Sequence, residues 1–226
     1  MLINNFKKQL ICWGGSDQCI VLKPIIEALG SKIDVIIDDT PELLSPFKEI
    51  PILQGKLGLT TWLRGRKLSN IGFIIAIGNP YGLARCQLHE YLVDLGLTPV
   101  TICDKSSMVA NDVVIGSGAQ IMQGVIVNTK AKLGKQCILN NKSLIEHHDE
   151  LGDGIEIAPG AILTGRVKVG NYSWICAGVT VIPRINIGSN VIIGAGAVVI
   201  NDIIDDVVAV GVPAKVIKKN TIKGNI

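Results

Sequence analysis

The stretch LGKQCILNNKSLIEHHDELGDGIEIAPGAILTGRVKVG, residues 133–170, has an aliphatic residue at every sixth position. The spacing continues on both sides, from Val109 to Val199, without an insertion. Helices need apolar residues about 3.6 positions apart and flat strands need them two apart, so a period of six fits neither. It fits a short strand and a turn, repeated three times per triangular coil, with the aliphatic side chain inside. The stretch therefore predicts a parallel β-helix of hexapeptide repeats.

One hexad breaks the pattern of the others. The fifth position of a hexad is small or apolar elsewhere, which allows the corner to close, but in IEHHDE (145–150) it is Asp149. The same hexad holds His147 and His148, two of the three histidines in the chain. Ionisable groups gathered in one hexad of a structural repeat indicate a functional site.

An α/β pattern precedes the repeat. We predict strands at 7–15, 32–39, 73–79 and 98–103, and helices at 16–30 and 80–96, in a largely parallel sheet. Pro24 is expected to kink or end the first helix. A strand, a glycine turn and a helix are typical of nucleotide sites, but GGSDQC (14–19) lacks the G-x-G-x-x-G fingerprint, which disfavours NAD. We expect domains at 1–105 (α/β, nucleotide-sugar binding) and 106–204 (β-helix), then a strand and basic tail at 205–226.

Composition excludes several classes of function. The net charge of +3 is too small to indicate nucleic acid or a membrane surface as a partner. No stretch is long and apolar enough to cross a membrane, and the first residues lack the apolar core of a signal peptide. The six cysteines show no spacing typical of a zinc site or redox pair, so we expect reduced thiols, no metal and a cytoplasmic location.

Four motifs carry a resemblance to a known family: IEHH (145–148), IAPGAILTG (157–165), IGAGAVV (193–199) and GVPAK (211–215). Together with the hexads they resemble the left-handed β-helix acyltransferases. With the α/β domain in front, the chain resembles their NeuD-type branch, which includes N-acetyltransferases of nucleotide-linked 4-amino-4,6-dideoxy sugars. The resemblance implies left-handed coils, acetyl-CoA as co-substrate and a role in surface polysaccharide synthesis, such as that of O-antigen. It also implies a homotrimer with acetyl-CoA between neighbouring prisms, which agrees with the apolar outer faces expected of the prism.

Site residues follow from the same resemblance. The catalytic histidine falls on His147, as general base for the attacking amine. The family usually has an acidic residue directly after it; here His148 has that position, and Asp149 and Glu150 come next. The resemblance also implies that Asn140 contacts the acceptor, that Glu156 lies beside the acetyl group where the family often has histidine, and that backbone amides of Gly165, Ala177 and Ala195 face the cofactor. Nucleotide contacts fall on Ser16, Asp17, Gln18, Asp38, Asp39 and Gly78.

Other interpretations stay open. Ser16 or Asp17 is also a helix N-cap, and Asp38 and Asp39 also simply end a strand. The basic tail, with Lys215, Lys218, Lys219 and Lys223, is either solvated or meets CoA phosphates. O-acetylation of a sialic-acid-like sugar predicts no nucleotide affinity, and a non-catalytic scaffold predicts no acetyl-CoA binding. A β-helix carbonic anhydrase needs three histidine ligands, which one chain cannot assemble at suitable spacing.

Overall fold

The computed structural model describes residues 4–222, which divide into two compact units. One unit contains the chain up to Ile77 together with Gln87–Thr101. The other contains Gly78–Cys86 together with the chain from Ile102 onward. The segment Gly78–Cys86 therefore groups with the hexad repeat, although it lies within the α/β part of the sequence.

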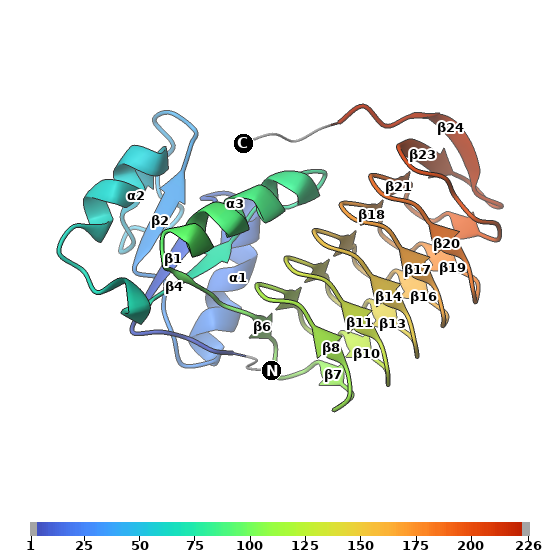
Figure 1. Cartoon of the computed structure of the whole chain (residues 1–226), viewed down its shortest axis with the longest axis horizontal. Helices are drawn as coiled ribbons and strands as arrows, with labels where there is room; N and C mark the ends of the chain where they lie inside the picture. The colour runs from blue at the N-terminus through green and yellow to red at the C-terminus, as the bar shows by residue number, and fades with distance from the viewer. Residues whose placement is uncertain (1–3, 223–226) are drawn as a thin grey trace. The chain divides into compact units, whose positions relative to one another are not determined.

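A five-stranded parallel sheet in the order β3-β2-β1-β4-β5 forms the α/β unit (Figure 1). Its strands are β1 (Gln9–Trp13), β2 (Val35–Asp38), β3 (Ile52–Gln54), β4 (Ile71–Ile75) and β5 (Thr98–Pro99). Its helices are α1 (Asp17–Ala28), α2 (Gly55–Leu63), the short η1 (Leu68–Asn70) and the part of α3 (Gly82–Asp94) from Gln87 onward. Strand residues such as Ile11, Ile37 and Phe73 are fully buried, as expected for parallel strands covered on both faces.

The first helix differs from the sequence expectation. It runs from Asp17 to Ala28 and continues through Pro24, which was expected to kink or end it. The proline removes one hydrogen bond, whereas Leu22, Ile25 and Ile26 bury their side chains completely on the same helix. Packing therefore outweighs the local penalty. Ser16 occupies the N-cap position, but its side chain makes no capping hydrogen bond.

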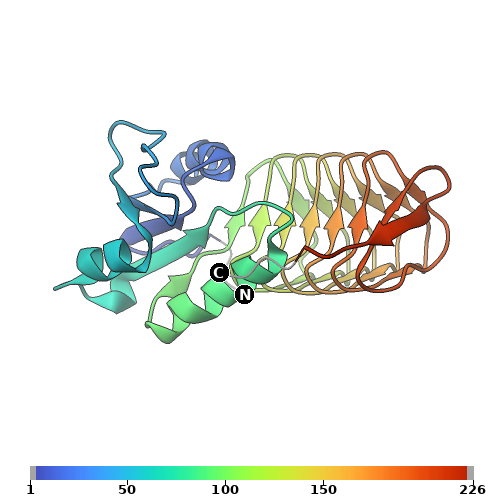
Figure 2. The ribbon, with the colours of Figure 1, turned by 90° about the horizontal axis from the view of Figure 1, so that it is seen from above.

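The second unit is a left-handed parallel β-helix, so the predicted fold class is confirmed. Figure 1 shows its coils stacked along one axis, and Figure 2 shows the same coils in a row after a turn of 90°. Neighbouring coils pair residues 18 positions apart, for example Asn128 with Glu146 and Ile126 with Leu144. Three hexads therefore make one coil. The aliphatic residues of the repeat, such as Val127, Ile145 and Leu163, point inward and are buried.

Each coil contributes one short strand to each of three faces. The first face contains β6 (Ile102–Cys103), β9 (Gln120–Ile121), β12 (Ile138–Leu139), β15 (Glu156–Ile157), β18 (Trp174–Ile175), β21 (Ile192–Ile193), β23 (Val207–Val210) and β24 (Lys215–Lys219). The second contains β7 (Met108–Val109), β10 (Ile126–Val127), β13 (Leu144–Ile145), β16 (Ile162–Leu163), β19 (Thr180–Val181) and β22 (Val198–Val199). The third contains β8 (Val114–Ile115), β11 (Lys132–Leu133), β14 (Glu150–Leu151), β17 (Lys168–Val169) and β20 (Asn186–Ile187).

The outward residues distinguish the faces. On the second face the outward positions are almost all apolar: Met108, Ile126, Leu144, Ile162, Thr180 and Val198. On the third face they are mostly charged or polar: Val114, Lys132, Glu150, Lys168 and Asn186. The turns that follow strands of the first, second and third faces form what we call the first, second and third corners of the prism.

The C-terminal end of the prism is closed by a reversed strand. The last coil is shorter, because Asn186 pairs with Asp202 across 16 residues. Strand β24 then runs antiparallel to β23, with Val207 opposite Lys219. Ala214 and Gly211 also bond to the backbone of Val198, the edge of the second face. Among the helices of residues 4–222, none combines the length and apolar character needed to span a membrane.

Candidate active site

The hexad with both histidines forms a turn at the second corner, between β13 and β14. His148 takes a left-handed backbone conformation with φ of 61°, as do the residues one coil below and above it, Lys130 and Arg166. Its N–H donates to the carbonyl of Thr129 in the coil below, and the carbonyl of His147 accepts from the N–H of Arg166 in the coil above. The turn is thus fixed to both neighbouring coils.

Asp149, the exception in the repeat, is a buried anchor of this turn. Its side chain is inaccessible to solvent. One carboxylate oxygen accepts from the N–H of Glu146 and the other from the N–H of Val167, both at 2.8 Å. Burial raises the pKa of Asp149 to about 7, while the N–H groups of Val167, Glu146 and Gly165 oppose the rise. Asp149 and Glu150 are the acidic residues that come next after His148 in the sequence, and both of these hydrogen bonds of Asp149 go to backbone N–H groups.

The partner of His147 is instead His148. The Nδ1 atoms of the two rings are 3.2 Å apart, and the rings meet edge to face with an interplanar angle of 88°. The ring of His147 is exposed, and that of His148 is partly buried. Glu146 holds the backbone at this point, because its carboxylate accepts from the N–H of His147 at 3.0 Å and from the amide of Asn128 at 2.8 Å.

Gly165, predicted to contact the cofactor, lies directly beside the ring of His147. A Cβ atom at this position would come within 3.1 Å of both Cε1 and Nε2 of His147, and the φ of Gly165 is +107°. Glycine is therefore required here both by the backbone and by the close ring. Because Nδ1 faces His148, the Nε2 edge of His147 is the one that lies towards the next coil.

A second group of predicted residues meets on the first face and its corner. The amide of Asn140 donates to one carboxylate oxygen of Glu156 at 2.9 Å. The other carboxylate oxygen lies 3.9 Å from the position that a Cβ atom on Gly78 would occupy, which is van der Waals contact. Burial raises the pKa of Glu156, while nearby Arg85 and Asn140 act in the opposite direction. Asn140, Glu156 and Gly78 are thus brought together.

Ala177 and Ala195 belong to the same side of the prism. Both are exposed residues in first-corner turns, after β18 and β21. His147 and Gly165 lie in second-corner turns, after β13 and β16. Within one chain, His147 and Gly165 therefore lie at one corner of the prism, and Asn140, Ala177 and Ala195 lie at another, with the second face between the two corners.

In the α/β unit, the predicted nucleotide residues lie at the carboxyl ends of β1 and β2. Asp38 accepts from the N–H of Gly15 at 2.7 Å and of Thr40 at 2.8 Å, and Asp39 accepts from the indole of Trp13 at 3.3 Å. Asp38 thereby fixes the loop before Ser16, Asp17 and Gln18. It also lines a hollow of about 190 Å³ with Ile52 and other residues near β3.

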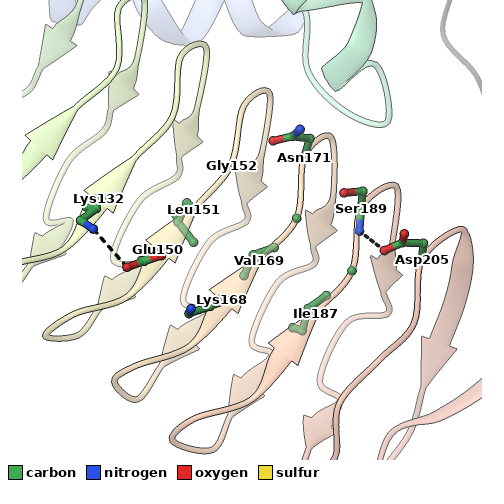
Figure 3. Close-up of a pocket in the computed structure, with 12 residues that line it drawn as sticks. Lys132, Glu150, Leu151, Gly152, Lys168, Val169, Asn171, Ile187, Ser189 and Asp205 are labelled. Carbon is green, nitrogen blue, oxygen red and sulfur yellow. Dashed lines mark hydrogen bonds and ion pairs between the residues drawn. The ribbon is translucent and has the colours of Figure 1, made fainter.

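Another side of the prism also contains a groove. It has a volume of about 520 Å³ and runs along the third face, as Figure 3 shows. Glu150 lines this groove and forms an ion pair with Lys132 at 3.2 Å, so its carboxylate lies on the third face. None of the other residues predicted for catalysis or binding lines this groove. In the tail, Lys215, Lys218 and Lys219 are exposed on β24, and Lys223 lies outside the described residues.

Sequence reasoning missed two features of the site. Arg85 is fully buried and donates to the carbonyl of Gly154 at 2.8 Å, which ties Gly78–Cys86 to the third corner. The turn position of His148 is occupied by basic residues in the neighbouring coils, namely Lys130, Arg166 and Arg184. Reading the sequence at steps of 18 would have found this basic row. Within residues 4–222, no three His, Cys, Asp or Glu side chains gather as metal ligands would.

Comparisons with known proteins identify the family. No protein-family model matches the chain. The structure superposes on a variant of GDP-perosamine N-acetyltransferase from Caulobacter crescentus, solved with CoA and GDP-perosamine, with a TM-score of 0.85 and 30% identity, covering 96% of this chain and 97% of that one. The chain belongs to the hexapeptide-repeat acetyltransferases. Another family member, the acetyltransferase domain of PglB from Neisseria gonorrhoeae in complex with acetyl coenzyme A, matches with a TM-score of 0.82 and 25% identity, over 93% of this chain and all of that one.

Curated relatives match over shorter segments. GDP-perosamine N-acetyltransferase of Escherichia coli O157:H7 is 32% identical over 124 residues, 55% of each chain. The bifunctional protein GlmU of Clostridioides difficile is 37% identical over 112 residues, 47% of this chain. The chain thus spans 55% and 23% of these relatives, less than two thirds of their lengths.

Proposed function

We propose that the protein transfers the acetyl group of acetyl-CoA to the amino group of a nucleotide-linked 4-amino-4,6-dideoxy sugar. The observation that carries this proposal is the near-complete structural match, through both units, to an N-acetyltransferase crystallised with CoA and GDP-perosamine. A match confined to the β-helix would support acyl transfer alone, because the coil is shared by many acceptor classes. The match of the α/β unit supports a nucleotide-linked acceptor.

His147 is the general base of the proposed reaction. Its exposed ring is held on one side by His148 and faces Gly165 on the other, so that Nε2 is the atom available to a substrate. The amine attacks the thioester carbonyl directly, and Nε2 takes the proton that the nitrogen loses. The tetrahedral intermediate then expels the CoA thiolate. An imidazole suits this role because its ordinary pKa is close to neutral pH.

Acceptor and cofactor bind on the residues predicted from the sequence. Asn140 contacts the acceptor, and Glu156 lies beside the acetyl group. Nucleotide contacts come from the loop of Ser16, Asp17 and Gln18 and from Asp38, Asp39 and Gly78. Backbone groups at Gly165, Ala177 and Ala195 line the path of the pantetheine arm. The α/β domain, 1–105, thereby selects the acceptor, and the β-helix, 106–204, carries out the transfer.

The active form is a homotrimer built on the second face. This face is apolar on the outside, which is typical of an interface. Three prisms that turn their second faces to a threefold axis bring the second corner of one prism against the first corner of the next. His147 of one chain then meets Asn140, Ala177 and Ala195 of its neighbour. The division of the site between two corners thus supports the trimer.

Replacing His147 by Ala tests the proposed base. We expect the rate of acetyl transfer to fall by at least ~100-fold, the usual contribution of a general base, with substrate binding retained. A variant that turns over at nearly the normal rate would remove His147 from the mechanism.

A thermal-shift panel tests the acceptor class. Wild-type protein is heated with UDP, GDP or dTDP, each with and without CoA, because a ligand that binds the folded form raises the Tm. One nucleotide should raise the Tm more than the other two. A shift with CoA but with none of the nucleotides would favour O-acetylation of a free sugar, and no shift with any ligand would favour a scaffold.

A further inference from the structure

The contact between the two histidines requires a definite arrangement of protons. Their Nδ1 atoms are 3.2 Å apart, which is hydrogen-bond distance. A neutral imidazole carries a proton on one nitrogen and a lone pair on the other. One Nδ1 must therefore donate and the other accept, and the choice decides which nitrogen of each ring is left for other work.

The proposed role of His147 as general base assigns His148 as the acceptor, because Nε2 of His147 can take a proton only if the proton of its neutral ring is on Nδ1, and the surroundings of His148 agree with this. Burial lowers the pKa of His148, and the nearby charges of Arg166, Lys130 and His147 lower it further, while Asp112 opposes them. Arg166 is one coil above and Lys130 one coil below, both at the turn position that His148 occupies. A ring between two cations stays neutral, and in its Nε2–H tautomer a neutral His148 offers a lone pair at Nδ1.

Building on the proposed function, we propose that His148 is a positioning residue: its neutral ring accepts, at Nδ1, the hydrogen bond from Nδ1–H of His147. This leaves the proton of His148 on Nε2. It also leaves Nε2 of His147 unprotonated, beside Gly165, where the general base is needed. When Nε2 takes the proton from the attacking amine, the resulting imidazolium keeps its Nδ1–H bond to His148, and no proton passes to His148.

The local structure explains why a histidine performs this task here. The only buried carboxylate of the turn, Asp149, is occupied by the N–H groups of Glu146 and Val167. The carboxylate of Glu146 accepts from the N–H of His147 and the amide of Asn128. Both acidic side chains therefore hold the backbone, and the ring of His148 is the acceptor left to fix His147.

A matched pair of variants separates the hydrogen bond from the fold. Position 148 has a φ of 61°, which both asparagine and glycine adopt readily. His148→Asn keeps an acceptor oxygen near the place of Nδ1, whereas His148→Gly removes it. We expect His148→Gly to lower kcat by about 10-fold or more with little change in KM, and His148→Asn to recover at least about a third of the wild-type kcat. In a His147→Ala background, His148→Gly should have no further effect on kcat, because the two act as one unit.

Nitrogen-15 NMR of the histidine-labelled protein tests the arrangement without substrate, and so independently of the proposed reaction. We expect the neutral ring of His147 to carry its proton on Nδ1 and that of His148 on Nε2. In His148→Gly, the proton of His147 should move mainly to Nε2, the form that free histidine prefers, and His148→Asn should restore it to Nδ1. A wild-type His147 with its proton on Nε2, or an equal loss of kcat from His148→Gly with and without His147, would overturn the proposal. If the wild-type protein shows the expected NMR pattern but does not acetylate the nucleotide-linked amino sugar, the result would count against the proposed substrate and not against the arrangement of the two histidines.

Discussion

The buried carboxylate of Asp149 predicts an unusual dependence of stability on pH. Its pKa is about 7 in the folded protein, against an ordinary value of 3.8. Between these values the folded chain holds a proton that the unfolded chain has released, so the contribution of Asp149 to stability is full below pH 4 and is lost as the pH rises to about 7. A pKa difference of about 3 corresponds to at most about 4 kcal/mol. Asp149→Asn removes this ionisation. At pH 4, where wild-type Asp149 is protonated in the folded state, the substitution costs about 1–3 kcal/mol because one N–H loses its acceptor.

Urea unfolding at pH 4, 5, 6, 7 and 8 measures the effect, with the protein concentration held constant because subunits are expected to associate. The difference in unfolding free energy between wild type and Asp149→Asn should shift in favour of the variant by up to about 4 kcal/mol from pH 4 to pH 8. Glu156, which burial also affects, is the same in both proteins and cancels. A difference that is constant with pH, or that shifts in favour of wild type, would refute the reasoning.

Two further substitutions test the geometry of the site and the interface. Gly165→Ala places a methyl group 3.1 Å from Nε2 of His147 at a φ of +107°, so kcat should fall about 10-fold or more and stability by about 1–3 kcal/mol. In the control Gly124→Ala, at a φ of +67°, the methyl group makes ordinary van der Waals contact with Lys142 at 3.5 Å, and only stability should fall. A normal kcat in Gly165→Ala would contradict the placement of the base. Leu144→Glu puts a charge on the second face and should give monomers by sedimentation. Val114→Glu, on the third face, should leave the proposed trimer intact. If both variants sediment as trimers, the second face is not the interface.

The repeat made the β-helix predictable, because one period determines which residues point inward and where the chain turns. The exception at Asp149 was visible for the same reason. Its role was not, because the N–H of Val167 that it accepts from is 18 positions away and belongs to the next coil. Side-chain neighbours in a solenoid lie one coil apart, and the sequence shows them only when it is read with the length of the coil.

Other features have no periodic signal. Arg85 resembles any helix residue in the sequence, yet it is fully buried and bonded to the carbonyl of Gly154. Strand β3 has only three residues, too few for a hydrophobic period to develop, and α2 begins directly after it. The prediction for Pro24 considered only the local cost of a proline inside a helix. The burial of Leu22, Ile25 and Ile26 stabilises the helix enough to continue through it.

The reversed strand at the end of the prism has a consequence for growth of the stack. A β-helix that stopped at its last coil would present three rows of free backbone groups, on which coils from another molecule could continue the ladder. Here β24 occupies the rim of the first face and carries Lys215, Lys218 and Lys219, and Gly211 and Ala214 occupy the rim of the second. At this end of the prism, two of the three rows are therefore covered or charged, which disfavours end-to-end joining of molecules into fibrils.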